Sequence, residues 1–247
     1  MITQIAVRQA AGVVATGEGW RDKFIERWDM EPAIVTVIEN GSAFVDLLHC
    51  EHLQSFLKTD KRNEAVNIVY IGAFEPWHGI PILLNAVANA IARGVLVRVV
   101  LIGSGSELSR IEILIGDLQL EAFVTLTGHL GATQITSYLA RADIGVSPYC
   151  GRVEYSGLKL LDYKAAGLAT IASGENGQPA VLEHGRTGWI VPPCDEDLLC
   201  EAIIRLANNV NLRQQIGRQA RMEAENCHSW RHTAEKLEKI FAQVLRN

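Results

Sequence analysis

Several classes of protein are excluded by what this sequence lacks. Lysine and arginine number 23 against 28 aspartate and glutamate, and the net charge of −5 offers no cationic excess for nucleic acid or a membrane surface. The longest apolar region, 80–92, is interrupted by Asn85 and Asn89. It is shorter than the ~20 residues that a transmembrane helix needs. The amino terminus has neither the basic segment nor the apolar block of a signal peptide. We therefore expect a cytoplasmic protein with no nucleic-acid partner and no transmembrane segment.

Cysteine is scarce and follows no recognisable pattern. The five residues form no CxxC pair, and a chain of 247 residues is too large to need disulfides for folding. Five reduced thiols are therefore expected, at Cys50, Cys150, Cys194, Cys200 and Cys227.

Short runs rich in valine and isoleucine alternate with helix-like segments from about residue 66 onward. These runs are apolar nearly throughout, as strands buried on both faces should be. Strict alternation predicts an α/β fold with a doubly wound parallel sheet, Rossmann-like, over 65–228. The predicted strands are 66–72, 95–103, 122–128, 142–148, 168–173 and 189–193, and helices are expected from Ile80 to Ile91 and near 107–118, 133–141, 157–166, 196–208, 211–225 and 229–246.

The first part of the chain, 1–58, has a different organisation. It contains two expected strands, 11–16 and 33–39, with a helix between them and a further helix that reaches Lys58. Two strands and two helices cannot cover both faces of a sheet, so this part is expected to be a small partial second lobe, or an extension that docks on the main domain. A charged linker, 58–64, follows. The last segment, 229–247, is expected to pack back on the domain or toward the amino-terminal part, through an apolar stripe formed by Trp230, Ala234, Leu237, Phe241 and Val244 or Leu245.

Ligands of doubly wound sheets bind beyond the carboxyl ends of the strands, where the strand order reverses. With the common order 3-2-1-4-5-6, the loops that follow the first and fourth strands open this crevice. These loops are "GAFEPWHG" (72–79) and "YCGRVEYSG" (149–157), and each contains glycine and leads into a helix. They form the candidate site.

The second loop suggests a way to bind a phosphorylated ligand. A helix that begins near Ser156 or Gly157 would point unpaired backbone amides at a phosphate. Lys159 could add a positive charge, and Asp162 could accept hydrogen bonds from the hydroxyls of a sugar. Glu154 would face the crevice ahead of the phosphate. The alternative is that Lys159 and Asp162 form a solvated ion pair on a surface helix.

Over about 65–232 the sequence resembles retaining glycosyltransferases of family four, also called glycosyltransferase group 1, whose fold is GT-B. The resemblance rests on "VYIGAFEPWHGIPILLNAV", "YLARADIGVSPY", "AAGLATIAS", "EHGRTGWIVPP" and an acid pair, Glu154 and Asp162. It implies that Glu154 is the catalytic acid residue at the donor sugar and that Asp162 binds the ribose. It also implies that the diphosphate lies on Ser156, Gly157 and Leu158, beside Lys159.

The resemblance also assigns donor contacts to the other loops. The first loop would contribute Gly72, Ala73, His78 and Gly79, and the end of the third strand would bring Gly128 and His129 to the base. A structural or solvent-facing role for His129 is an equal alternative. Many relatives have arginine and lysine where this chain has Ala73 and His78, and the second acid, usually glutamate, is Asp162 here. His78 would be only partly cationic near pH 7.

The resemblance thus implies the donor-binding part of an enzyme that uses a nucleotide diphosphate sugar, with no cofactor and no metal, and an acceptor that the sequence does not reveal. Residues 1–58 look like the remnant of its acceptor lobe. The alternative is a non-catalytic nucleotide-binding or interaction module, or half of a split enzyme completed by a partner chain or a homo-oligomer. A nicotinamide dehydrogenase is disfavoured because "GSGSEL" follows the second strand, not the first, and lacks a third glycine.

Overall fold

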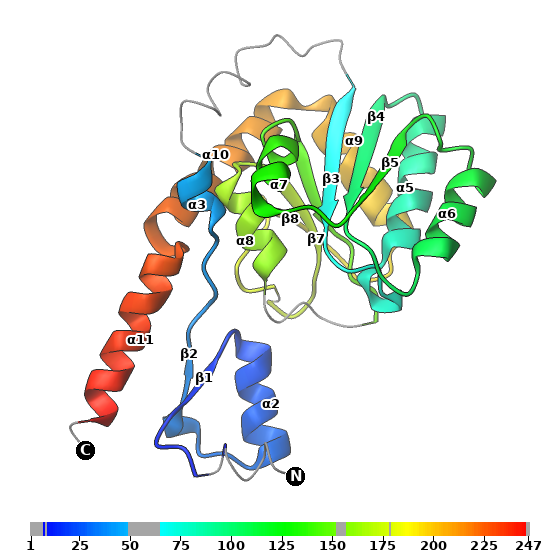
Figure 1. Ribbon diagram of the computed structural model, residues 1–247. Helices are drawn as coiled ribbons and strands as arrows, with labels where there is room; N and C mark the ends of the chain where they lie inside the picture. Colours follow the sequence, from blue (N-terminus) through cyan, green and yellow to red (C-terminus); the bar gives the residue numbers. More distant parts are fainter. Residues whose placement is uncertain (1–6, 8, 49–64, 152–156, 178, 246–247) are drawn as a thin grey trace.

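The computed structural model describes residues 7, 9–48, 65–151, 157–177 and 179–245. Figure 1 shows a large domain in which helices flank a central sheet, and a small amino-terminal unit that lies apart from it. A single segment of chain and the last helix, α11 (Trp230–Val244), extend from the large domain toward the small unit.

The central sheet has six strands, all parallel, in the order β5-β4-β3-β6-β7-β8. This is the common order 3-2-1-4-5-6 that was assumed when the candidate loops were chosen, and the doubly wound α/β fold is confirmed. Burial on both faces explains the continuous apolar runs. In β3, Ile68 and Tyr70 face one core while Val69 faces the other. The strands are β3 (Val66–Ile71), β4 (Val97–Ile102), β5 (Val124–Gly128), β6 (Ile144–Ser147), β7 (Ala169–Ser173) and β8 (Trp189–Val191).

Two groups of helices cover the two faces of this sheet. One core contains side chains of α5 (Ile80–Ala92), α6 (Leu108–Asp117) and α9 (Glu196–Asn208). The other contains side chains of α3, α7 and α8, and α10 contributes to both. The bounds of these helices are α3 (Phe44–Leu47), α7 (Ala132–Leu139), α8 (Leu158–Ala165) and α10 (Val210–Cys227). None of the helices in the described ranges is both long and apolar enough to cross a bilayer.

The amino-terminal unit consists of two short parallel strands and one main helix. Val13–Ala15 (β1) pairs with Val35–Val37 (β2), and Glu18–Trp28 (α2) packs beside them. A short helix, η1 (Pro32–Ile34), lies between α2 and β2 in the chain. No residue of α2 is buried, so the unit has only a small core. The expected helix up to Lys58 is described only as α3, which ends at Leu47, and 49–64 lie outside the described residues.

The apolar stripe of α11 departs from expectation. Thr233 is the buried residue of this helix. Trp230, Phe241 and Leu245 are 48%, 62% and 86% exposed. The prediction that the whole stripe packs is therefore wrong for these three residues. A helix with one apolar stripe indicates which face would be buried, but not whether another element lies against it.

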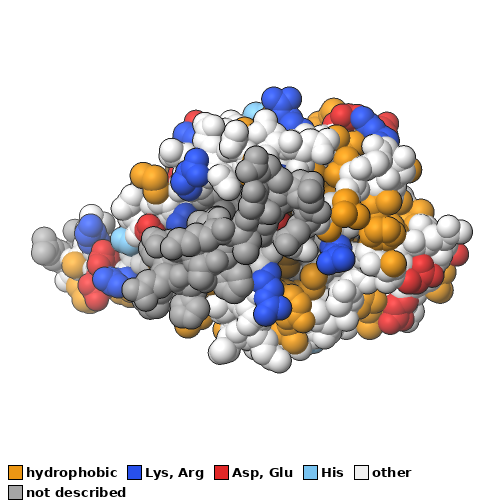
Figure 2. Space-filling view, turned by 90° about the horizontal axis from the view of Figure 1, so that it is seen from above, with side chains coloured by type: hydrophobic (Ala, Val, Ile, Leu, Met, Phe, Trp, Pro, Cys, Tyr) orange, Lys and Arg blue, Asp and Glu red, His pale blue; other side chains and the backbone are white. Residues whose placement is uncertain are grey.

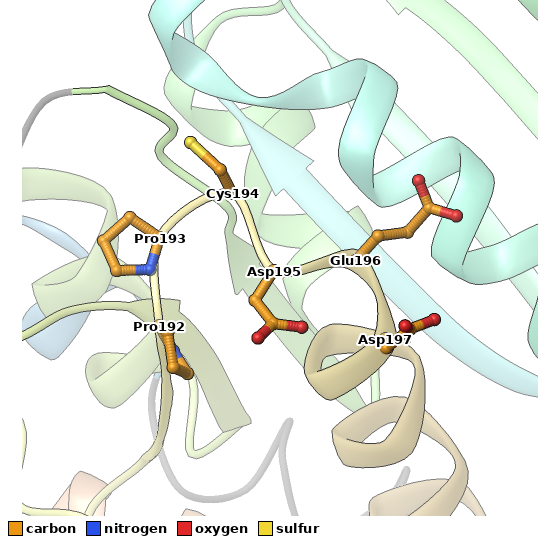
Figure 3. A pocket seen from close by; sticks show the side chains of 6 residues that line it. All are labelled: Pro192, Pro193, Cys194, Asp195, Glu196 and Asp197. Carbon is orange, nitrogen blue, oxygen red and sulfur yellow. The ribbon is translucent and has the colours of Figure 1, made fainter.

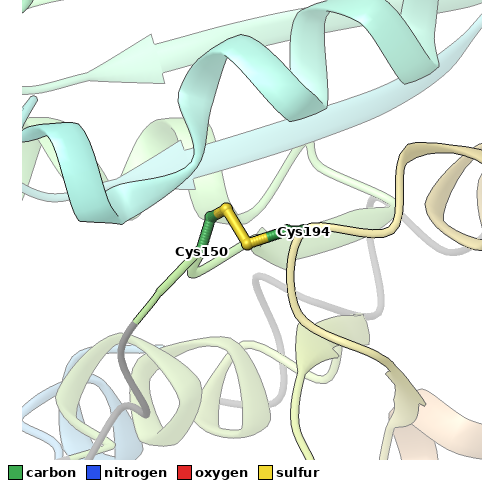
Figure 4. Close-up of a disulfide and its surroundings, with 2 residues drawn as sticks. All are labelled: Cys150 and Cys194. Atoms are coloured by element: carbon green, nitrogen blue, oxygen red, sulfur yellow. A yellow bond between two sulfur atoms is a disulfide. The ribbon is translucent and has the colours of Figure 1, made fainter.

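A disulfide overturns the expectation that all five thiols are reduced. Cys150, in the loop after β6, is bonded to Cys194, in the loop after β8, and their Cα atoms are 4.7 Å apart (Figure 4). Cys200 and Cys227 are free, and Cys50 lies outside the described residues. The two bonded cysteines are 44 positions apart in sequence, and they meet only because parallel strands bring their loops to the same edge of the sheet.

Candidate functional site

Glycines let the loops after β3, β4 and β5 approach one another closely. The Gly72 amide donates to the Ile102 carbonyl at 3.0 Å, and the Gly103 amide donates to Gly128 at 2.9 Å. A Cβ atom on Gly103 would lie 1.9 Å from the Gly72 oxygen, so no side chain fits there. Gly128 and His129 are exposed at the end of β5. This edge is therefore lined by backbone rather than by bulky side chains.

The two loops predicted to flank the crevice are in direct contact. The first contains a short helix, η2 (Pro76–His78), which ends at Gly79 with φ of 68°. A Cβ atom on Gly79 would lie 1.6 Å from the Pro148 oxygen, and the Cys150 amide donates to the Trp77 carbonyl at 3.0 Å. The carboxyl ends of β3 and β6 are thus tied together at the point where the strand order reverses.

His78 lies between two tyrosines in this contact. Its Nδ1 is 3.0 Å from the Tyr70 hydroxyl and also contacts the Ala73 carbonyl, while its Nε2 is 3.0 Å from the Tyr149 hydroxyl. Burial lowers the pKa of His78, and the charge of Lys159 acts in the same direction, although the Ala73 carbonyl and Glu75 oppose both. This histidine is therefore suited to hold the loops together in its neutral form, and less to neutralise a phosphate.

Among the described residues of this region, the cation is Lys159, near the start of α8. Its side chain is buried, and its Nζ lies 4.6 Å from the ring centroid of Tyr70 and 4.8 Å from that of Tyr149. A Cβ atom on Gly72 would lie 3.1 Å from Nζ, which places the ammonium beside the end of β3. The tyrosine faces stabilise a cation that burial would otherwise destabilise. The solvated ion pair with Asp162 is therefore not formed.

The start of α8 has the geometry of an anion site. Gly157 precedes the helix with φ of 58°, a left-handed conformation that glycine adopts without strain. The first turn carries no acidic residue, so the positive end of the helix dipole is not neutralised there. Leu158 is exposed. Glu154 and Ser156, the other predicted members of this loop, lie outside the described residues.

Asp162 lies one turn further along α8 and contacts the segment that leads from the amino-terminal unit. Its Oδ1 accepts a hydrogen bond from the Ser42 hydroxyl at 2.6 Å. Burial raises the pKa of Asp162 to about 6, and the hydrogen bond from Ser42 acts against this rise. The carboxyl group is therefore half-ionised only slightly below neutral pH.

A hollow of about 490 Å3 lies outside these loops and includes Cys194 of the disulfide in its lining (Figure 3). It is lined by 192–197, and its three carboxylates belong to Asp195, Glu196 and Asp197. Asp195 caps α9, since its Oδ1 accepts from the Leu198 amide at 2.8 Å. Carboxylates repel phosphate, so this hollow does not suit the predicted donor. Among the residues that the structure describes, no group of histidine, cysteine and acidic side chains is arranged to hold a metal ion.

The distribution of basic side chains on the surface agrees with the absence of a cationic excess in the composition. On the face seen in Figure 2, outside the grey residues, lysine and arginine side chains are scattered and form no single patch. The part of this face that the grey residues leave visible therefore shows no continuous basic surface of the kind that nucleic acid would need.

A comparison with known families decides the assignment. The sequence pattern of the family described as glycosyl transferases group 1 matches 54–223, which is more than half of the chain. The chain belongs to this family. The resemblance inferred from the sequence is thus confirmed, and the members that give this family its name are enzymes.

Individual relatives of group 1 support the assignment. An alpha-D-kanosaminyltransferase from Streptomyces kanamyceticus is 26% identical over 177 residues, which cover 72% of this chain and 45% of that protein. A phosphatidyl-myo-inositol mannosyltransferase from Mycolicibacterium smegmatis is 25% identical over 221 residues, which cover 88% of this chain and 55% of that protein. The chain therefore spans about half the length of the curated relatives it matches.

Solved structures show the same fold. The crystal structure of HepE from Anabaena in complex with UDP and glucose aligns with a TM-score of 0.84 at 18% identity. The alignment covers 98% of this chain and 66% of that one.

Several of the predicted site residues of this group 1 chain lie together at the reversal point of the sheet. They are Gly72, Ala73, His78, Gly79 and Lys159, with Gly157 at the start of α8. Gly128 and His129 lie two strands away, at the end of β5. Sequence reasoning assigned no role to Ser42, Tyr70 or Tyr149, because their roles depend on contacts across the fold. The available signals were the tyrosine within the apolar run of β3 and the place of Tyr149 at the start of the candidate loop 149–157.

Proposed function

We propose that this chain contains the donor-binding lobe of a retaining glycosyltransferase, which transfers a sugar from a nucleoside diphosphate sugar to an acceptor hydroxyl. The observation that carries the proposal is the position of Lys159 and the start of α8 at the reversal point of the sheet. A buried ammonium and a helix amino terminus provide a local positive potential, although the chain as a whole is acidic.

Each part of the donor has a proposed partner. The diphosphate lies at Ser156, Gly157 and Leu158 with the ammonium of Lys159 beside it. The hydroxyls of the ribose donate to Asp162, whose position one turn further along the helix supports this order. Glu154 faces the transferred sugar as the catalytic residue. The base lies toward Gly128 and His129, which are exposed at the end of β5.

The acceptor side is proposed to lie on the other lobe of the enzyme. Residues 1–58 are assigned to the remnant of that lobe, because β1 and β2 form a two-stranded parallel sheet with a very small core. The described residues therefore supply one wall of the cleft, and transfer needs a second wall from further polypeptide. No metal or cofactor takes part in this proposal.

Nucleotide binding is the direct test. We expect UDP, GDP or ADP to raise the midpoint of thermal unfolding. At a ligand concentration 100-fold above Kd, the stabilisation is about 2.7 kcal/mol, or roughly 5 °C or more for a chain of this size. Asp195→Asn, in the acidic hollow, is the matched control and should respond as the wild type does. If none of the three nucleotides at millimolar concentration shifts the midpoint, the proposal fails.

The affinity for the nucleotide should depend on the pKa of Asp162. The ribose hydroxyls donate to the ionised carboxylate, so affinity is highest above pH 6 and falls as the pH drops through about 6. Calorimetric titration between pH 5 and 8 measures this fall. The nucleotide phosphate also titrates in this range, so Asp162→Asn is measured in parallel as the control. If nucleotide affinity changes with pH in the same way in the wild type and in Asp162→Asn, the role of Asp162 is contradicted.

A further inference from the structure

We propose that Ser42, in the segment that joins the amino-terminal unit to the sheet domain, is a positioning residue that orients Asp162 for the ribose of the donor. This inference rests on the proposed function, and it adds a residue that lies far from the donor loops in sequence. Ser42 and Asp162 are 120 positions apart.

The hydrogen bonds of Ser42 fix the direction of its hydroxyl. Ser42 is only 1% exposed, and its Oγ accepts from the Phe44 amide at 3.1 Å. The same hydroxyl donates to Asp162 Oδ1 at 2.6 Å. A hydroxyl has one proton, so this proton is committed to Asp162 while the oxygen is held by the backbone.

The backbone around Ser42 is anchored on both sides. The Ser42 amide donates to the His228 carbonyl at 2.7 Å, immediately before α11. A Cβ atom on Gly41 would lie 2.4 Å from the backbone nitrogen of Trp230, so the segment that contains Gly41 approaches the start of α11 closely. Phe44 is buried against the core that α7 and α8 share. Ser42 therefore reaches Asp162 from a rigid base, as a positioning group must.

The bond leaves the carboxylate suited to bind a diol. With Oδ1 held by Ser42, the carboxylate plane is fixed and Oδ2 can accept from a ribose hydroxyl. A hydrogen bond to the charged form also opposes the effect of burial on the Asp162 pKa, so more of the carboxylate is ionised near neutral pH.

The neighbouring charged groups bond elsewhere. Lys159 lies over the tyrosine rings, and Lys164 donates to Val181 and Glu223 at 2.7 and 2.5 Å. His228 faces Glu39 and Glu223, at 3.5 and 3.6 Å. Among the described contacts, the Ser42 hydroxyl is thus the group directed at Asp162.

The test compares Ser42→Ala with the wild type in nucleotide affinity as a function of pH. The probe is whichever of UDP, GDP and ADP protects the wild type from thermal unfolding. We expect Ser42→Ala to bind it roughly 10-fold more weakly, because a hydrogen bond to a charged group is lost. The pH at which affinity falls should move upward, since the carboxylate loses the donor that lowers its pKa. Ser42→Cys, which is similar in size but a poor donor, should show the same upward shift and gives a second measurement if Ser42→Ala does not fold.

Ser229→Ala is the matched control for damage to this region. Ser229 is buried and caps α11 next to the same segment, but its hydroxyl contacts His232 and not Asp162. It should leave the pH profile unchanged. The positioning role is overturned if both Ser42 variants keep the wild-type affinity and pH profile, or if Ser229→Ala shifts the profile as much as they do. Combined with Asp162→Asn, Ser42→Ala should cause no further loss, and an additive loss would also overturn it. Failure of the wild type to bind any nucleotide would instead reject the proposed function.

Discussion

Gly79→Ala is expected to lower the free energy of unfolding by roughly 3 kcal/mol or more, because it combines backbone strain with a steric clash. Gly79 has φ of 68°, which costs alanine about 1 kcal/mol. The new Cβ atom would also lie 1.6 Å from the Pro148 oxygen and 2.8 Å from its carbonyl carbon. Both neighbours are backbone atoms and cannot rotate away. The loops after β3 and β6 would have to separate at the reversal point of the sheet.

Gly128→Ala separates the two contributions. Gly128 has nearly the same φ, 70°, but a Cβ atom there would have no neighbour within 4 Å. This variant should lose only the conformational part, about 1 kcal/mol. Urea unfolding, monitored by circular dichroism, measures the free energy of unfolding of each variant. A loss in Gly79→Ala no larger than that in Gly128→Ala would show that the two loops are not in the close contact described.

Lys159→Met is expected to weaken binding of the nucleoside diphosphate by roughly 10- to 100-fold, the range of a charge-assisted hydrogen bond. Lys159 supplies a buried cation beside Gly72, in a loop where Ala73 and a neutral His78 supply none. Methionine keeps much of the apolar stem that packs between the tyrosines, so the fold should be retained. Calorimetric titration with the diphosphate and with the matching nucleoside measures the effect, which should be confined to the diphosphate.

Lys239→Met is the control for the loss of one positive charge. Lys239 is exposed on α11, so its removal changes the net charge equally without touching the candidate site. The affinity of Lys239→Met for the nucleoside diphosphate should match that of the wild type. If Lys159→Met weakens nucleoside and diphosphate binding to the same degree, Lys159 acts on the structure of the loops and not on the phosphates.

The local patterns of this sequence were sufficient to predict the helices and strands and their succession along the chain. The helix expected at 196–208 has the same bounds in the structure, where Asp195 caps it. The strands could be predicted because strands buried on both faces are apolar nearly throughout. The order of the sheet is the common one for this fold, which was assumed and is the order found. The position of the reversal point, and hence of the two candidate loops, came from the same reasoning.

The side-chain contacts within the site could not be predicted in this way. An ion pair between Lys159 and Asp162 was the alternative left open because both lie on one helix, yet each bonds to a residue from another part of the chain. The pairing of Cys150 with Cys194 and the exposure of Phe241 were likewise not predicted.

What the amino-acid sequence determined by itself is the set of strands and helices, the faces they bury and the edge at which ligands would bind. These depend on hydrophobic periodicity, which is a property of neighbouring residues. Only the tertiary structure decided that Lys159 lies over Tyr70 and Tyr149 and that Ser42 donates to Asp162. Such contacts depend on how elements distant in sequence are brought together, and a difference of a few ångströms there decides whether a hydrogen bond forms.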